Sequence, residues 1–188
     1  MAENVRQPIA YNRLANLVKS TGVSTNTASM IDYVRYVKEA CLLFTLENYA
    51  SKFVEKETIK KHYFTDNGLL GIFLNDADTS LLENMCAIFL YKHYNRDDDA
   101  PRLYYYNRNI EVDFYIPDEH IAIQASYDIA DEATRDREVN ALAQLNALEP
   151  LKQAFIITYD QEDLIERNGL SISVVPIWKW LLKADMMK

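Results

Sequence analysis

The sequence predicts an α/β or α+β protein built from two modules. Some segments carry apolar residues at helical spacing, others alternate apolar and polar residues as strands do, and the second half interleaves the two patterns. The 188 residues are 49% hydrophobic and 26% charged, which is enough apolar material for a core. Only four Gly and five Pro argue against long flexible linkers.

The chain is expected to begin with two short helices. Leu14, Leu17 and Val18 have helical spacing, and a turn containing Gly22 follows. Ser24 is a residue type that caps helices, so it is expected to start a second helix over residues 25–40. Two short helices joined by a glycine turn are typical of a helix-turn-helix.

Two strands, over residues 41–49 and 52–64, are expected to follow these helices. A helix-turn-helix with a two-stranded ribbon is the winged-helix pattern, and we assign it to residues 1–66. The same pattern also occurs in proteins with no role in DNA binding, so the pattern alone leaves both interpretations open.

Charge is divided unevenly between the two modules. The net charge is −8, which argues against a general nucleic-acid binder. Residues 1–62 hold nine Lys/Arg against six Asp/Glu, a net of +3, and the remainder is at −11. Any DNA binding is therefore expected in the first module, and it should be weak and salt-sensitive. The candidate contacts are Lys19, Thr25, Asn26, Arg35, Lys60 and Lys61.

The second module is assigned to residues 67–188 and starts near the Asn67-Gly68 turn signal. Its pattern alternates helices and strands, which is typical of a mixed sheet covered by helices. The expected elements are a helix at 81–94, strands at 102–107, 110–117 and 121–128, a helix at 131–148, strands at 153–160 and 172–177, and a helix at 178–184.

The stretch "IEVDFYIPDEHIAIQAS", residues 110–126, is the part of this module that could carry chemistry. Strand alternation places Ile110, Val112, Phe114 and Ile116 on one face of its first strand. If the apolar faces are buried together, Glu111, Asp113, Gln124 and Ser126 cluster on the opposite side. The alternative is that these four are ordinary polar residues on the less buried face of the sheet.

Phosphodiester cleavage at such a cluster would need a hard cation held by oxygen ligands. Asp113 offers a carboxylate, but Gln124 offers only a neutral carbonyl. Ser126 cannot replace a lysine that orients the attacking water and offsets the phosphate charge. The electrostatics are therefore poor for catalysis, unless Glu111 substitutes for the missing acid.

Three charged residues on the flanking helices have two interpretations each. Glu83 could join the cluster from the preceding helix, or it could form a capping box with Ser80. Arg137 and Glu138 could point toward the cluster, although a solvated helix face is the default expectation.

Several other classes of function are not indicated by the sequence. The four glycines are too scattered for a phosphate-binding loop, so we expect no ATP hydrolysis by this chain. The His and Cys spacings fit no zinc site. Cys41 and Cys86 lie in apolar periodic segments and are expected to be buried free thiols in a reducing cytoplasm. The chain shows no signal-peptide pattern and no apolar run long enough to span a membrane.

Several stretches, taken together and in order, resemble the C-terminal portion of predicted prokaryotic AAA-type ATPases, in a form common in Bacteroides-like bacteria. In that family an ATPase module precedes a winged helix and a domain of unknown function with a restriction-endonuclease-like core. The matching stretches are "YNRLANLVKSTGVSTNT", "DYVRYVKEACLLF", "KKHYFTDNGLL", "LLENMCAIFLY", "EVDFYIP", "IAIQASYDIADEATRDRE" and "AFIITYD".

The resemblance implies nuclease-core positions at Glu83, Asp113, Gln124 and Ser126, with Asp113 and Glu83 as metal ligands and magnesium as the metal of an active form. The family carries a Glu-x-Lys motif on the second strand of its core, and this chain lacks both the acid and the lysine of that motif. The sequence also lacks the family's ATPase module. It is therefore expected to be a fragment of a longer protein or a stand-alone form, and to need no cofactor of its own.

Two functions follow from the resemblance. One is a non-catalytic region that binds DNA or protein and governs an attached or separate ATPase module. The other is a divergent magnesium-dependent DNA nuclease. A structural dimerisation module, and with it a homo-oligomer, stays an open third interpretation.

Overall fold

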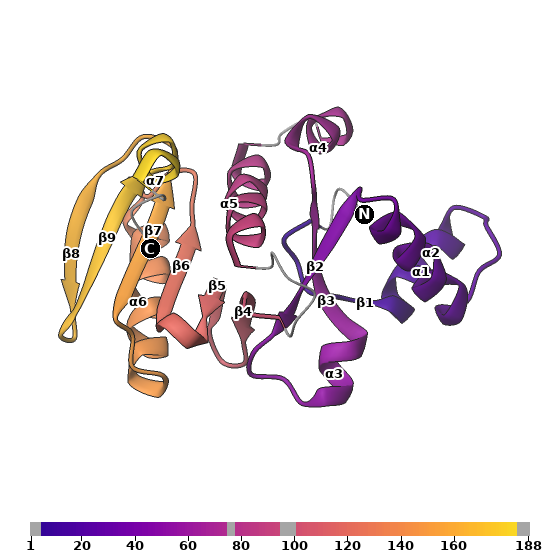
Figure 1. Ribbon diagram of the computed structural model, residues 1–188, viewed down its shortest axis with the longest axis horizontal. Helices are drawn as coiled ribbons and strands as arrows, with labels where there is room; N and C mark the ends of the chain where they lie inside the picture. The colour runs from indigo at the N-terminus through magenta and orange to yellow at the C-terminus, as the bar shows by residue number, and fades with distance from the viewer. Residues whose placement is uncertain (1–4, 75–77, 95–100, 184–188) are drawn as a thin grey trace.

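The protein is an α/β structure organised around one large mixed sheet. The computed structural model in Figure 1 describes residues 5–74, 78–94 and 101–183. Its strands are β1 (Ile9–Ala10), β2 (Leu43–Asn48), β3 (Ile59–Phe64), β4 (Tyr104–Asn107), β5 (Glu111–Ile116), β6 (Ile121–Ala125), β7 (Gln153–Thr158), β8 (Asp163–Arg167) and β9 (Leu170–Pro176). Within the described residues they form a nine-stranded sheet in the order β1-β3-β2-β4-β5-β6-β7-β9-β8. The predicted α/β class is therefore confirmed.

Parallel and antiparallel pairs are mixed in this sheet. The pairs β2–β4, β6–β7 and β7–β9 are parallel, whereas β1–β3, β2–β3, β4–β5, β5–β6 and β8–β9 are antiparallel. The helices are α1 (Tyr11–Ser20), α2 (Thr27–Glu39), α3 (Phe53–Thr58), α4 (Asn67–Phe73), α5 (Asp78–Tyr94), α6 (Glu132–Leu148) and α7 (Ile177–Lys183). In the described part of the chain, none of these helices is both long and apolar enough to cross a membrane.

The two N-terminal helices have a small core of their own, beside the β1 edge of the sheet (Figure 1). This core consists of Ile9, Leu14, Ala15, Met30 and Val34. Helix α2 begins after Asn26, whose side chain accepts a hydrogen bond from the Ser29 amide at 2.9 Å. The prediction that Ser24 caps this helix is therefore wrong, because the chain enters the helix two residues later.

The β2–β3 hairpin joins these helices to the rest of the sheet. Strand β3 pairs with both β1 and β2, and β2 pairs in parallel with β4. Residues on both sides of position 66 also share one hydrophobic cluster, to which Phe44 and Leu46 contribute from β2. The division into modules at residue 66 stays a prediction, and the sheet and the core both run across it.

Three segments of the structure differ from what the sequence predicts. The strand expected over 52–64 starts as helix α3, because the polar run after Val54 has no apolar alternation to hold it in a sheet. The Asn67-Gly68 turn signal lies inside helix α4, which is capped by the Asp66 carboxylate accepting from the amides of Gly68 and Leu69. Strand β8 was not predicted, since its polar sequence "DLIER" lies at the sheet edge.

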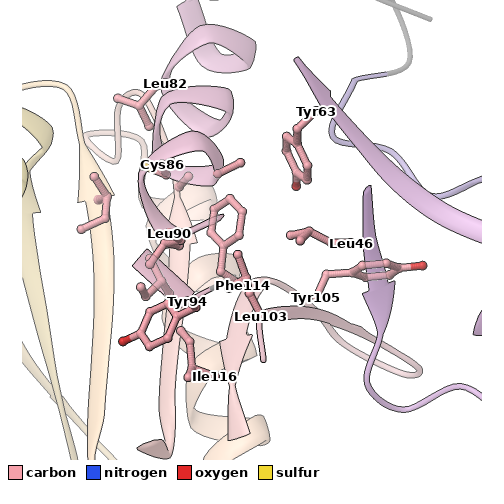
Figure 2. Close-up of a cluster of buried hydrophobic side chains, with 14 of the residues drawn as sticks. Leu46, Tyr63, Leu82, Cys86, Leu90, Tyr94, Leu103, Tyr105, Phe114 and Ile116 are labelled. Carbon is pink, nitrogen blue, oxygen red and sulfur yellow. The ribbon is translucent and has the colours of Figure 1, made fainter. Parts of the chain in front are cut away.

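Helices cover both faces of the central strands. Helices α5 and α7 pack on one face through residues such as Cys86, Leu90 and Trp180, and Figure 2 shows part of this cluster. Helix α6 packs on the opposite face through Val139, Leu142 and Leu145. Helix α6 begins at a cap in which the Asp131 carboxylate accepts from the Thr134 amide at 2.8 Å.

Two predictions about individual side chains are wrong. Phe114 and Ile116 face the α5 side, but Val112 joins Tyr115 in the α6-side cluster. The simple alternation fails because the pairing of β4 with β5 shifts register between Tyr104 and Tyr106. Cys86 is buried as expected, but Cys41 is exposed, because the chain turns out of α2 there with φ at 55°.

Candidate functional site

A cavity of about 560 Å³ lies where strands β5 and β6 separate. Glu83 from α5, Asp113 from β5, and Gln124 and Ser126 at the end of β6 all line it. The sequence prediction that these four residues lie together is therefore confirmed. The alternative of a less buried sheet face is wrong for Gln124 and Ser126, which are both buried, whereas Glu111 is half exposed.

Side chains continue the sheet where its regular pairing stops. Main-chain pairing of β5 with β6 extends to Phe114 and Ile123. Beyond that point, Gln124 Oε1 accepts from the Asp113 amide and Gln124 Nε2 donates to the Glu111 carbonyl, both at 2.9 Å. Asp113 Oδ2 accepts from the Ala125 amide at 3.1 Å. An ionised glutamate at position 124 could not donate to the Glu111 carbonyl. The presence of glutamine at this position is therefore explained by its structural role.

Lys61 from β3 is the cation of this site. Its side chain is fully buried, and its Nζ lies 3.0 Å from Asp113 Oδ1, 3.2 Å from Glu111 Oε1 and 3.5 Å from Glu83 Oε1. Burial alone would lower the pKa of Lys61, but the charges of Asp113, Glu83 and Glu111 raise it, and the net direction is upward. The ammonium is therefore charged throughout the physiological range.

Glu83 is held largely as a neutral acid. Burial and the nearby Asp113 charge raise its pKa to about 8, against the lowering effect of Lys61. Its Oε1 also accepts a hydrogen bond from the Tyr63 hydroxyl at 2.8 Å. Helix α5 starts at Asp78, so Ser80 lies inside the helix and no capping box with Glu83 forms. Glu83 instead belongs to the cavity.

Arg137 and Glu138 also line the cavity. The expectation of a solvated helix face is wrong for Glu138, which is buried, and correct for Arg137, which is largely exposed. Arg137 Nη2 lies 2.5 Å from Glu138 Oε1, and the Glu138 side chain is only 9% exposed. Burial raises the pKa of Glu138, with Asp113 and Glu111 acting in the same direction and Arg137 opposing them. Arg137 itself reaches solvent, with 71% of its side chain exposed.

The donor set does not fit the magnesium ion that the resemblance implies. Magnesium requires several oxygen ligands in near-octahedral geometry. Both Asp113 oxygens are already engaged, one by Lys61 and one by the Ala125 amide. Glu83 is mostly protonated at neutral pH and accepts from Tyr63. Ser126 Oγ donates to the Asp128 carbonyl at 3.2 Å. Within the described residues, no group of three or more His, Cys, Asp or Glu is arranged to hold a metal ion.

The predicted DNA contacts do not form one cationic surface. Lys61 lies in the cavity, so its assignment as a surface phosphate contact is wrong. Lys60 pairs with Glu47 at 3.1 Å. Arg35 pairs with Asp32 at 3.0 Å and Glu39 at 4.0 Å. Asn26 uses its side chain as the α2 cap, and Thr25 is half-buried. Lys19 is exposed in the last turn of α1.

Sequence reasoning did not assign Lys61 or Arg6 to the cavity, and it did not find Tyr63, whose hydroxyl donates to Glu83 Oε1. Lys61 was given another role, and Arg6 and Tyr63 were given none. The pattern "IKKHYF" of β3 does place Lys61 and Tyr63 on one face of a strand. This alternation shows that the Lys61 and Tyr63 side chains lie on the same face of β3, but it does not show which part of the fold that face contacts.

The chain is similar to the uncharacterized protein MJ1544 of Methanocaldococcus jannaschii, with 30% identity over 186 residues. The similarity covers 93% of this chain but 41% of the relative, so the chain spans about two fifths of that protein's length. No family model matches the chain. No solved structure matches it either.

Proposed function

We propose that the chain is a non-catalytic interaction region of a AAA-type ATPase, made of a winged helix and a degenerate restriction-endonuclease-like core. The winged-helix assignment is supported by α1 and α2 followed by the β2–β3 hairpin. The core assignment is supported by the β5–β6 hairpin between α5 and α6, with the four implied nuclease positions around one cavity. The link to an ATPase module rests on the sequence resemblance.

The single observation that carries the non-catalytic part is the placement of Lys61. Its ammonium lies between Asp113, Glu111 and Glu83, where a metal-dependent nuclease would gather carboxylates around a divalent cation. A lysine in that position offsets the charge of Asp113 and Glu111 without offering an open coordination site. The cluster is therefore stabilised as an internal ion-pair network.

The exposed surface of α2 favours a protein partner over DNA. Ile31, Tyr33 and Tyr36 are each about half exposed there, and the Arg35 charge is offset by Asp32 and Glu39. Few free cations remain to displace counterions from a phosphate backbone. The attached or separate ATPase module is the partner that the resemblance suggests. Two free cysteines are in keeping with the proposed cytoplasmic location.

We expect the purified protein to leave DNA intact. Single-stranded, duplex and branched DNA would be incubated with Mg²⁺ or Mn²⁺ and compared with a sample lacking protein. Losing one well-placed electrostatic group typically lowers a rate by about two to three orders of magnitude, and two positions are altered here. The rate should therefore stay at background. Cleavage that disappears in Asp113→Ala would contradict the proposal.

The alternative, a divergent magnesium-dependent nuclease, is favoured by one observation. Lys61 brings a lysine to within 3.0 Å of Asp113, although the sequence places serine at position 126. The same cleavage assay decides between the two functions, because only a nuclease would cleave the DNA and lose that activity in Asp113→Ala.

A further inference from the structure

The mouth of the cavity is rich in hydrogen-bond donors, in contrast to its acidic floor. Arg6 and Gln7 line it from the N-terminal segment, and Arg137, Asn140 and Gln144 line it from α6. The three α6 residues recur at spacings of three and four, so they lie along one side of the helix. Guanidinium and amide groups from two segments far apart in sequence therefore converge on one opening.

Arg6 forms no salt bridge in the described part of the chain. Val5, just before it, is buried in the main core, which anchors the segment. Arg6 itself adopts φ of 67°, a left-handed conformation that is uncommon for residues other than glycine. It is half-buried and lowers the pKa of Glu83 by its charge. A strained backbone thus directs a cation without an ion-pair partner to the cavity.

Arg137 supplies a second guanidinium with spare donors. Glu138 Oε1 accepts from its Nε and Nη2, and most of the side chain remains in solvent. Glu111 is the opposing feature at the opening, because it is half exposed and would repel an anion. Its charge is offset by Lys61, 3.2 Å away. An anion at the mouth would therefore meet two guanidiniums, above a floor whose carboxylate charge is partly offset by the Lys61 ammonium.

We infer that the cavity binds a phosphate ester of nucleotide size, with Arg6 and Arg137 holding the phosphate. Guanidinium groups match phosphate oxygens in a bidentate geometry. The 560 Å³ volume lies within the range of small-ligand sites and far exceeds a lone phosphate. Gln7, Asn140 and Gln144 supply amides for the remainder of the ligand. The inference rests on the proposed function, because it treats the cavity as a binding site and not as a catalytic one.

Calorimetric titration in buffer with a metal chelator tests this inference. The probes are adenosine monophosphate, adenosine, inorganic phosphate and a single-stranded oligonucleotide of ten thymidines. We expect the nucleotide-bearing probes to bind more tightly than adenosine or phosphate. Arg6→Ala and Arg137→Ala should each weaken that binding by about 10-fold or more, as expected for a lost charge-assisted hydrogen-bonding group. Arg137→Lys, which keeps the charge and loses the fork, should lie between.

Arg135→Ala is the matched control, since Arg135 lies on the same helix but pairs with Asp163, outside the cavity. It should bind as the wild type does. Equal losses in Arg135→Ala and Arg137→Ala, adenosine binding as tightly as its monophosphate, or no binding of any nucleotide would overturn the inference. Binding of the free nucleotide or of the oligonucleotide alone would identify the source of the phosphate ester. DNA cleavage would overturn the non-catalytic function and leave this binding result standing.

Discussion

Replacing Lys61 with methionine is expected to lower the free energy of unfolding by about 3–5 kcal/mol, because removing one partner leaves the largely buried Asp113 carboxylate without compensation. Methionine keeps an unbranched side chain but lacks the ammonium that lies within 3.5 Å of Asp113, Glu111 and Glu83. Stabilities of natural domains are only about 5–15 kcal/mol, so the loss would be a large fraction of the total. Urea unfolding followed by fluorescence of Trp178 and Trp180 measures it.

The neighbouring Lys60→Met provides the control for this prediction. Among the described residues Lys60 pairs with Glu47 alone, and both side chains keep some exposure to solvent, so the loss should be smaller than for Lys61→Met. The double variant Lys61→Met with Asp113→Asn should be more stable than Lys61→Met alone, because it removes a charge that has lost its counter-ion. Wild-type stability in Lys61→Met, or a double variant weaker by the sum of two losses, would show that Lys61 does not compensate these carboxylates.

The second large effect expected is a fall in stability as the pH rises from about 4.5 to 8. The pKa of Glu83 is raised from 4.5 to about 8 by burial and by Asp113, so the folded protein binds a proton that the unfolded chain releases. The stabilisation that protonated Glu83 contributes is fully present below its pKa in the unfolded chain. It is lost as the pH rises through its pKa in the folded protein. The slope should be on the order of 1 kcal/mol per pH unit within that window. Glu138, whose pKa is also raised, acts in the same direction.

Glu83→Gln isolates the contribution of Glu83 to this pH dependence. Glutamine resembles the protonated acid, so the variant should show a much flatter profile between pH 5 and 8. Glu166→Gln, on an exposed position of the edge strand β8, is the control and should keep the wild-type profile. If urea unfolding gives the same pH profile for the wild type and Glu83→Gln, Glu83 is not the group that titrates.

Much of the second module could be predicted because its local patterns agree with its tertiary environment. The apolar alternation of residues 121–125 gave the correct faces, with Ile121, Ile123 and Ala125 toward α5 and Ala122 toward α6. The grouping of Glu83, Asp113, Gln124 and Ser126 followed from the hairpin and the resemblance. Strand β5 was less predictable, because a register shift against β4 moves Val112 to the other face.

The chemistry of the site depends on residues that are distant in sequence, and this is where prediction from the sequence failed. Lys61 is 52 positions from Asp113, and only the pairing of β3, β2 and β4 brings the first module against the cavity. A lysine in a basic segment is normally solvent-exposed, so the sequence favoured a phosphate contact. Burial of a lysine requires compensating charges, and those come from α5 and β5.

A crystal structure determined after soaking in Mn²⁺ tests the central claim, that Lys61 occupies the place of a divalent cation, most directly. We expect no anomalous scattering peak among Glu83, Glu111 and Asp113, and Lys61 Nζ should remain in hydrogen-bonding contact with Asp113. Lys61→Met crystals soaked in parallel distinguish two reasons for an empty site. Manganese should bind in the variant if the ammonium blocks the site, and it should not bind if suitable ligands are lacking. A manganese ion bound to Asp113 in the wild type, with Lys61 displaced, would contradict the claim.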